Sequence, residues 1–176
     1  MRHVLAIAVV FWLAGCSESD SDVDHRINVE GDVDTYMHPK LGELYHEDVD
    51  WQSDQAAVSF CHSPIEVCLA DGSDDGPSEA AMSGYEWVES HWEQVRELIQ
   101  DQAFEFYEPY ADAVDGVPKF ESPSQLWKTE IVLGLRMFSR DEFSVTLRFE
   151  WQQNDDPHEV TFYVEGGKCE SHSVDG

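Results

Sequence analysis

The chain has 176 residues, of which 37 are acidic and 10 are basic, and its formal net charge is −27 at pH 7. That length is sufficient for one domain with a substantial core. So negative a chain repels the phosphates of nucleic acids and anionic lipid headgroups, so we expect no binding to nucleic acid. The charge favours solubility and weak cation binding, and an acidic surface can also imitate a nucleic acid and block a basic enzyme.

The first residues have the layout of an export signal. Arg2 gives the amino end a positive charge, and Val4 to Ala14 is an apolar run too short to span a bilayer as a mature helix. Small residues then lead to Cys16. We therefore predict a cleaved signal peptide over residues 1–15.

The ending Leu13-Ala14-Gly15-Cys16 resembles the lipobox of bacterial lipoproteins. The resemblance implies cleavage just before Cys16, a thioether-linked lipid on its sulfur and an acyl chain, such as palmitate, on the new amino terminus. More than one acyl chain makes such an anchor in the lipid bilayer stable. In enteric-type lipoproteins an aspartate after the cysteine favours the inner membrane, so Ser17 favours the outer membrane of the cell envelope.

Residues 16–37 are rich in serine and aspartate and poor in apolar groups. Such a segment cannot bury enough apolar surface to fold, and we predict a flexible acidic tether. A single domain is predicted over residues 38–176, with its folded part beginning near Leu41.

The amino-terminal part of the domain favours strands. Residues 41–45, 56–61 and 65–70 are predicted as short strands, with Trp51 in a connection between the first two. A loop follows over residues 71–76.

The cysteines allow two disulfide pairings in an oxidising compartment. Cys61 and Cys68 flank a predicted Ser63-Pro64 turn and would lie on one side of a hairpin, which makes them the disulfide candidates and leaves Cys169 unpaired. A bond between Cys68 and Cys169 is the alternative. The cysteine and histidine spacings match no closed zinc motif, so we expect no bound metal and no cofactor.

The middle of the chain predicts an amphipathic helix. Pro77 and Ser78 have the character of a helix start, and apolar residues then recur at spacings of three and four from Ala81 to Tyr110. Pro109 is expected to end or kink the helix near Glu108. The pattern fits one long helix or two helices with a break near Gln100. Residues 122–127 predict a short helical turn.

After residue 130 the apolar period changes to two. Strands are predicted over 131–138, 143–151 and 160–164, and a Gly166-Gly167 turn leads to a last strand around Cys169. The alternation predicts an antiparallel sheet with one buried face. The predicted fold class is therefore α+β: two layers, with an antiparallel β-sheet packed on one long or two consecutive amphipathic helices.

The order of these features resembles a loose group of bacterial domains of unknown function, some of which are similar to immunity proteins of toxin systems. The stretches that carry the resemblance are Leu41-Gly42-Glu43-Leu44, Phe106-Tyr107-Glu108-Pro109-Tyr110, Leu126-Trp127 and His158-Glu159-Val160 through Gly166-Gly167. The group has no agreed catalytic residues, so the resemblance implies none here.

Two surface features are candidate binding sites. In the predicted sheet, the side chains that point away from the helix include arginines beside aromatic rings, which is typical of a partner surface; these residues are Arg136, Phe138, Arg148 and Tyr163. The alternative is simple cross-strand pairing, such as Arg148 with Glu150 or Glu165.

Asp71, Ser73 and Asp75 match the first half of a calcium-binding loop. Pro77 and Met82 break the second half, and the alternative is an acidic turn before a helix amino terminus.

The leading hypothesis is a lipid-anchored, non-enzymatic binding module with a protein partner, of immunity type by the resemblance. One alternative is a small envelope hydrolase that uses a histidine–carboxylate pair around His91 or His158. Another is a cation-binding accessory lipoprotein. No catalytic motif is present, and no catalytic residue is predicted.

Overall fold

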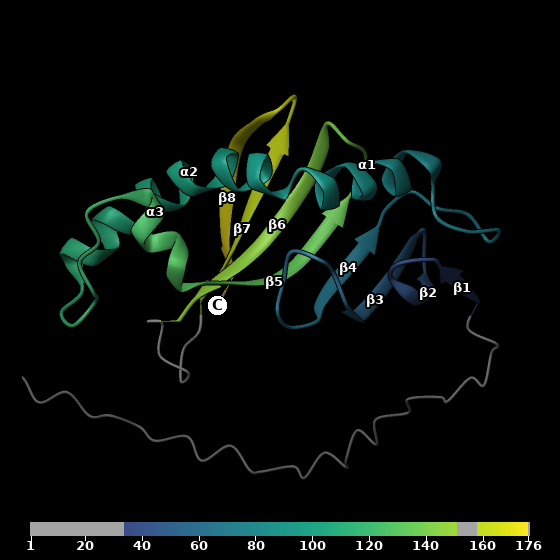
Figure 1. Cartoon of the computed structure of the whole chain (residues 1–176), viewed down its shortest axis with the longest axis horizontal. Coiled ribbons are helices and arrows are strands. Elements are labelled where there is room, and N and C mark those ends of the chain that lie inside the picture. The colour runs from purple at the N-terminus through teal and green to yellow at the C-terminus, as the bar shows by residue number, and fades with distance from the viewer. Residues whose placement is uncertain (1–33, 151–157, 176) are drawn as a thin grey trace, which may run out of the picture. The chain divides into compact units, whose positions relative to one another are not determined.

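The computed structural model describes residues 34–150 and 158–175 (Figure 1). The predicted signal peptide, Cys16, most of the predicted tether and Trp151 lie outside the described residues. Residues Val33–Gly176 form one compact unit. This unit is α+β, and its sheet is open and mostly antiparallel, in agreement with the predicted class.

The described sheet has eight strands in chain order, from β1 at one edge to β8 at the other. Their bounds are β1 Thr35–His38, β2 Gly42–Glu47, β3 Asp50–Ala56, β4 Ile65–Leu69, β5 Glu130–Met137, β6 Glu142–Phe149, β7 Glu159–Glu165 and β8 Lys168–Asp175. Each pair of neighbours is antiparallel except β4 and β5, which are parallel.

The parallel pair corrects the prediction of a wholly antiparallel sheet. Val67 of β4 lies beside Leu135 of β5, and the helices fill the chain between the two strands. A parallel neighbour requires a crossover long enough to return the chain to the same end of the sheet, and the helical segment supplies it.

The start of the sheet also differs from the predicted strands. β1 was not predicted, and β3 ends at Ala56, where the predicted strand begins. Trp51 lies inside β3 with only 1% of its surface exposed. The residues around Trp51 are mostly polar, so the sequence gives only a weak strand pattern there. In the structure the burial nevertheless alternates, because Trp51 and Ser53 are buried and Gln52 and Asp54 are not.

Two consecutive helices follow the loop after β4, namely α1 over Glu79–Ser90 and α2 over Trp92–Ala113. The hydroxyl of Ser78 accepts a hydrogen bond from the amide of Ala81 at 3.1 Å, which caps α1 as the sequence indicates. The break is at His91 and not near Gln100. The His91 amide donates to the Trp87 carbonyl at 2.9 Å, and Nδ1 lies 2.9 Å from the same oxygen.

Helix α2 continues through Pro109 to Ala113, beyond the predicted end at Glu108. A proline in a helix interior removes one backbone hydrogen bond, so contacts outside the helix must hold the last turn. Buried Ala111 and Tyr107 supply them; the Tyr107 hydroxyl accepts from the Phe120 amide at 3.1 Å and donates to the Pro118 carbonyl.

A short helix α3 (Pro123–Leu126) and the 3₁₀ turn η1 (Trp127–Thr129) lead into β5. They form where residues 122–127 predict a helical turn. Leu126 and Trp127 are buried there.

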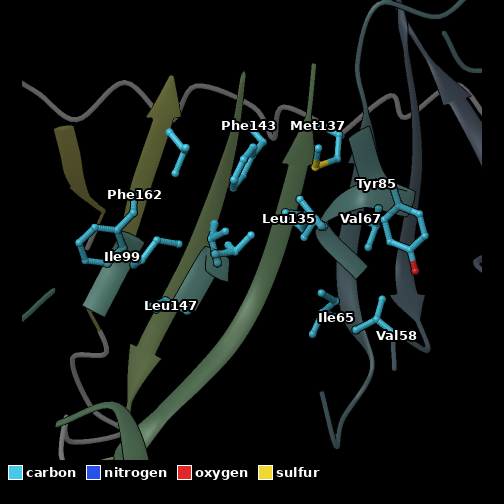
Figure 2. Close-up of a cluster of buried hydrophobic side chains, with 14 of the residues drawn as sticks. Val58, Ile65, Val67, Tyr85, Ile99, Leu135, Met137, Phe143, Leu147 and Phe162 are labelled. Carbon is cyan, nitrogen blue, oxygen red and sulfur yellow. The ribbon is translucent and has the colours of Figure 1, made fainter. Parts of the chain in front are cut away.

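One buried cluster joins the helices to the sheet. Figure 2 shows Tyr85 of α1 and Ile99 of α2 among side chains of β4 to β7, including Leu135 and Phe162. Helix α1 comes closest at Gly84, where an added Cβ would lie 2.6 Å from the carbonyl carbon of Ser139. The opposite surface of α2 carries a row of exposed carboxylates: Glu93, Glu97, Asp101, Glu105, Glu108 and Asp112.

Candidate functional site

The candidate site is on the face of β5, β6 and β7 that points away from the buried cluster, which we call the outer face. It is formed by alternate residues of these strands, which register places side by side: Gly134 beside Thr146, Arg136 beside Ser144, and Ser144 beside Tyr163. A hollow of about 560 Å³ lies over this face. Its lining residues are Glu66, Cys68, Leu133, Gly134, Leu135, Arg136, Phe138, Ser144, Thr146, Glu159, Thr161 and Tyr163.

Three of the four residues predicted as a partner surface therefore lie together, since Arg136, Phe138 and Tyr163 all line this hollow. Arg148 is on the same strand as Ser144 but pairs with Ile131, nearer the other end of β5, and does not line it.

A bulge in β5 also changes which residues face the hollow. The register shifts between Val132 and Gly134, so that Leu133 lines the hollow. Strict alternation along residues 131–138 predicts Leu133 on the buried face together with Leu135. One extra residue in a strand reverses the facing of everything beyond it, and the apolar run Ile131–Leu133 gives no sign of where the bulge falls.

Arg136 is held between a carboxylate and an aromatic ring. Its guanidinium donates to Oδ2 of Asp50 at 2.5 Å and lies 5.3 Å from the centre of the Phe138 ring. Nearly half of the side chain, 48%, stays exposed, whereas Asp50 is 12% exposed. Asp50 is not among the predicted site residues, because no strand is predicted at its position and 86 residues separate it from Arg136 in the chain.

Several of the residues that line the hollow carry hydroxyl groups, namely Ser144, Thr146, Thr161 and Tyr163. The Thr146 and Thr161 hydroxyls lie 2.9 Å apart, and the Tyr163 hydroxyl lies 3.3 Å from that of Ser173 on β8. Ser144 is buried, while 44% of the Tyr163 surface is exposed. The surface thus offers hydroxyl groups with both donor and acceptor capacity beside an exposed tyrosine.

Cys68 contributes a thiol to this hollow, and Cys61 does not. Burial raises the pKa of the Cys68 thiol to about 12; the positive charge of Arg136 opposes this shift, and Asp50 adds to it. Burial likewise raises the pKa of Cys61 to about 11, and that residue packs on the buried cluster near Tyr85. Both thiols are therefore protonated and weakly nucleophilic at neutral pH.

The two disulfide candidates do not meet across a hairpin. Cys61 lies in the connection after β3, and Cys68 of β4 has Gln52 as its partner on β3. Cys169 is on β8, at the far edge of the sheet from β4. No disulfide joins the cysteines of the described part of the chain.

The calcium candidates Asp71, Ser73 and Asp75 lie in a turn closed by its own hydrogen bonds. Ser73 and Gly76 exchange backbone hydrogen bonds at 3.0 Å, and the Trp51 indole donates to the Ser73 carbonyl at 3.0 Å. Within residues 34–150 and 158–175, no three histidine, cysteine or acidic side chains are grouped so as to hold a metal ion.

The two histidines of the hydrolase hypothesis, His91 and His158, are not among the residues that line the hollow. His91 stacks on Trp87, with ring centres 4.9 Å apart, and its Nδ1 contacts Ser90 and the Trp87 carbonyl. His158 directly precedes β7 and is partly buried. His91 thus joins α1 to α2 through hydrogen bonds and stacking.

The comparisons with known proteins identify a family. The model of a domain of unknown function, DUF6985, matches residues 40–164, and the chain belongs to this family. No curated protein and no solved structure gives a significant match. Among the residues that the structure describes, no helix is both long enough and apolar enough to cross a membrane.

Proposed function

We propose that this protein is a non-enzymatic binding module, anchored in the cell envelope through lipid on Cys16, and that a partner protein docks on the outer face of its sheet. In this proposal the domain has two layers, and the helical layer covers one face so that the other remains available. The observation that carries the proposal is the gathering of Arg136, Phe138 and Tyr163 around one hollow.

The composition of the hollow supports recognition. Arginine and tyrosine are enriched where partners contribute most binding energy, and each hydroxyl group of the hollow can both donate and accept a hydrogen bond. The exposed Tyr163 and the half-exposed Arg136 lie on either side of Ser144 in the register of β5, β6 and β7.

The chemistry of the hollow does not favour covalent catalysis. Its thiol, Cys68, has a pKa near 12, so at neutral pH almost none is present as the reactive thiolate. Within the described ranges of the chain, no histidine lines this hollow to act as a base for Ser144 or Thr146. An immunity-type role, in which the partner is a toxin that acts in the envelope, is the form of the proposal that the family resemblance implies.

The anchor can be tested separately from the domain. We expect Cys16→Ser to abolish lipid labelling and to move the protein from the membrane fraction to the soluble fraction, because no acyl chain can be attached. The outer-membrane part of the proposal requires the wild-type protein to separate with outer-membrane markers. Membrane retention of Cys16→Ser would contradict the lipobox reading.

The binding face can be located by photo-crosslinking in intact cells. A benzophenone residue at Tyr163 should capture a defined partner, while one at exposed Gln94 of α2 should not. Arg136→Glu should reduce the yield at Tyr163, because it breaks the contact with Asp50 and reverses a charge in the hollow. Capture only from Gln94, or no capture from either position, would contradict docking on the outer face.

A further inference from the structure

The charges around the hollow indicate which kind of partner it fits. On the outer face, carboxylates lie on three of the four strands from β4 to β7: Glu66 on β4, Glu142 on β6, and Glu159 and Glu165 on β7. The arginine in the hollow, Arg136, is already paired with Asp50. Arg148 on β6 and Lys168 on β8 add two further positive charges to this face, and the four carboxylates outnumber them. The face therefore stays negative, in agreement with the net charge of −27.

Two of these carboxylates are placed against each other. Glu142 and Glu165 are directly opposite in the β6–β7 register, and both are exposed. Like charges in that position repel and destabilise a sheet. Lys168 is opposite Glu165 on β8 and offsets one of the two charges, so this row keeps a net negative charge.

An aromatic ring lies beside this pair. Tyr163 is two residues from Glu165 on β7, and therefore about 7 Å away along the same face of the strand. Tyr163 is 44% exposed. A lysine or arginine side chain placed above this row could contact the ring and both carboxylates at once.

The protein already binds one cation in this manner. The guanidinium of Arg136 has a carboxylate at 2.5 Å and the Phe138 ring at 5.3 Å. The outer face therefore has two similar combinations of ring and carboxylate, and an arginine of the chain itself occupies the first.

We propose that the outer face binds a basic polypeptide segment, and that Tyr163, Glu142 and Glu165 hold one of its lysine or arginine side chains. This inference rests on the proposed function, since it specifies the chemistry of the partner that docks there. It commits the partner to a cationic loop or strand at the contact.

The test uses the purified full chain and a fluorescent peptide of alternating arginine and glycine, with a peptide of alternating glutamate and glycine as the control probe. We expect the arginine peptide to bind and the glutamate peptide not to bind. Glu142→Gln/Glu165→Gln should weaken binding about tenfold, and Tyr163→Leu several-fold. Lys168→Gln should strengthen binding, a change that damage to the fold would not produce.

A matched variant on the helix controls for overall charge. Glu97→Gln/Asp101→Gln removes two exposed carboxylates from α2 and leaves the outer face unchanged. Equal weakening by this variant and by Glu142→Gln/Glu165→Gln would overturn the proposal, since binding would then follow net charge alone. Absence of peptide binding while Tyr163 still captures a protein in cells would also overturn it, yet leave the binding-module function intact.

Discussion

At the scale of single residues, Glu130 is the clearest source of pH dependence. It opens β5 in a second hollow of about 540 Å³, with Cys61, Lys128 and Glu150 among the lining residues. Burial raises the pKa of its carboxyl from an ordinary value of 4.5 to about 7, although the positive charge of Arg96 opposes the shift and Glu150 adds to it. The folded protein therefore holds this carboxyl protonated in mildly acidic solution.

We predict that Glu130→Gln stabilises the protein above pH 7 and has little effect below about pH 4.5. A raised pKa means that stability is fully present below the unfolded value and is lost as the pH rises through the folded value. The gain should be about 1–3 kcal/mol, because the side chain is partly exposed. Urea unfolding across this range measures it, with exposed Glu121→Gln as control. A gain that does not vary with pH would contradict the assignment.

His38 gives the opposite pH dependence. Its ring is 3% exposed, and Nδ1 accepts hydrogen bonds from the amides of Leu41 at 3.0 Å and Lys40 at 3.2 Å. Burial lowers the pKa of the ring below its ordinary 6.5, although Glu86 and Glu89 oppose the shift. The neutral ring therefore stabilises the turn between β1 and β2.

We predict that His38→Ala costs about 1–3 kcal/mol near neutral pH, because two amides lose their acceptor. In the wild type this contribution is fully present above pH 6.5 and is lost as the pH falls through the lower folded pKa. His38→Asn supplies an acceptor that does not titrate, so it should retain part of the stability and lose the pH dependence. Thermal unfolding at several pH values distinguishes the three proteins; identical acid sensitivity in all three would exclude His38 as the source.

At the scale of the elements, the contact of α1 with the β5–β6 turn depends on Gly84. An added Cβ would lie 2.6 Å and 2.8 Å from backbone atoms of Ser139 and Arg140, which cannot move as a flexible side chain could. We predict that Gly84→Ala destabilises by about 1–3 kcal/mol, although alanine is the better helix former by about 1 kcal/mol. Ser83→Ala, on the exposed side of the same helix, should be close to neutral. Chemical denaturation of both variants checks this; a stabilising Gly84→Ala would mean that the contact is looser than described.

The elements that could be predicted are those whose apolar period is strong. The stripe from Ala81 to Tyr110 and the alternation in β6 and β7 specify one secondary structure each, and both are present. β3 was not predicted because its sequence is mostly polar. The bulge in β5 was not predicted because it lies within a continuous apolar run. The Arg136–Asp50 contact depends on the parallel pairing of β4 with β5, and local sequence does not specify which strands pair.

At the scale of the whole molecule, the net charge of −27 at pH 7 makes the surface carboxylates repel one another, and this repulsion destabilises the folded state. We predict that the melting temperature rises with sodium chloride, because screening shortens the reach of these charges from about 10 Å at 0.1 M salt to about 3 Å at 1 M. Calcium and magnesium should act alike at equal ionic strength. An additional rise with calcium alone, lost in Asp75→Asn, would instead assign a calcium site to the loop after β4.

The parallel pairing of β4 with β5 divides the described sheet into two sets of consecutive strands, β1–β4 and β5–β8. Within each set every strand pairs with the next strand along the chain, and such local pairs form quickly. The pairing of β4 with β5 is slower, because the whole helical segment lies between these two strands in the sequence. During synthesis the first set is complete while the inner edge of β4 is still unpaired, and β4 is apolar at Ile65, Val67 and Leu69. We expect nascent chains to associate incorrectly at this temporarily unpaired edge of β4. The pairing of β5 with β4 covers the edge and prevents such association.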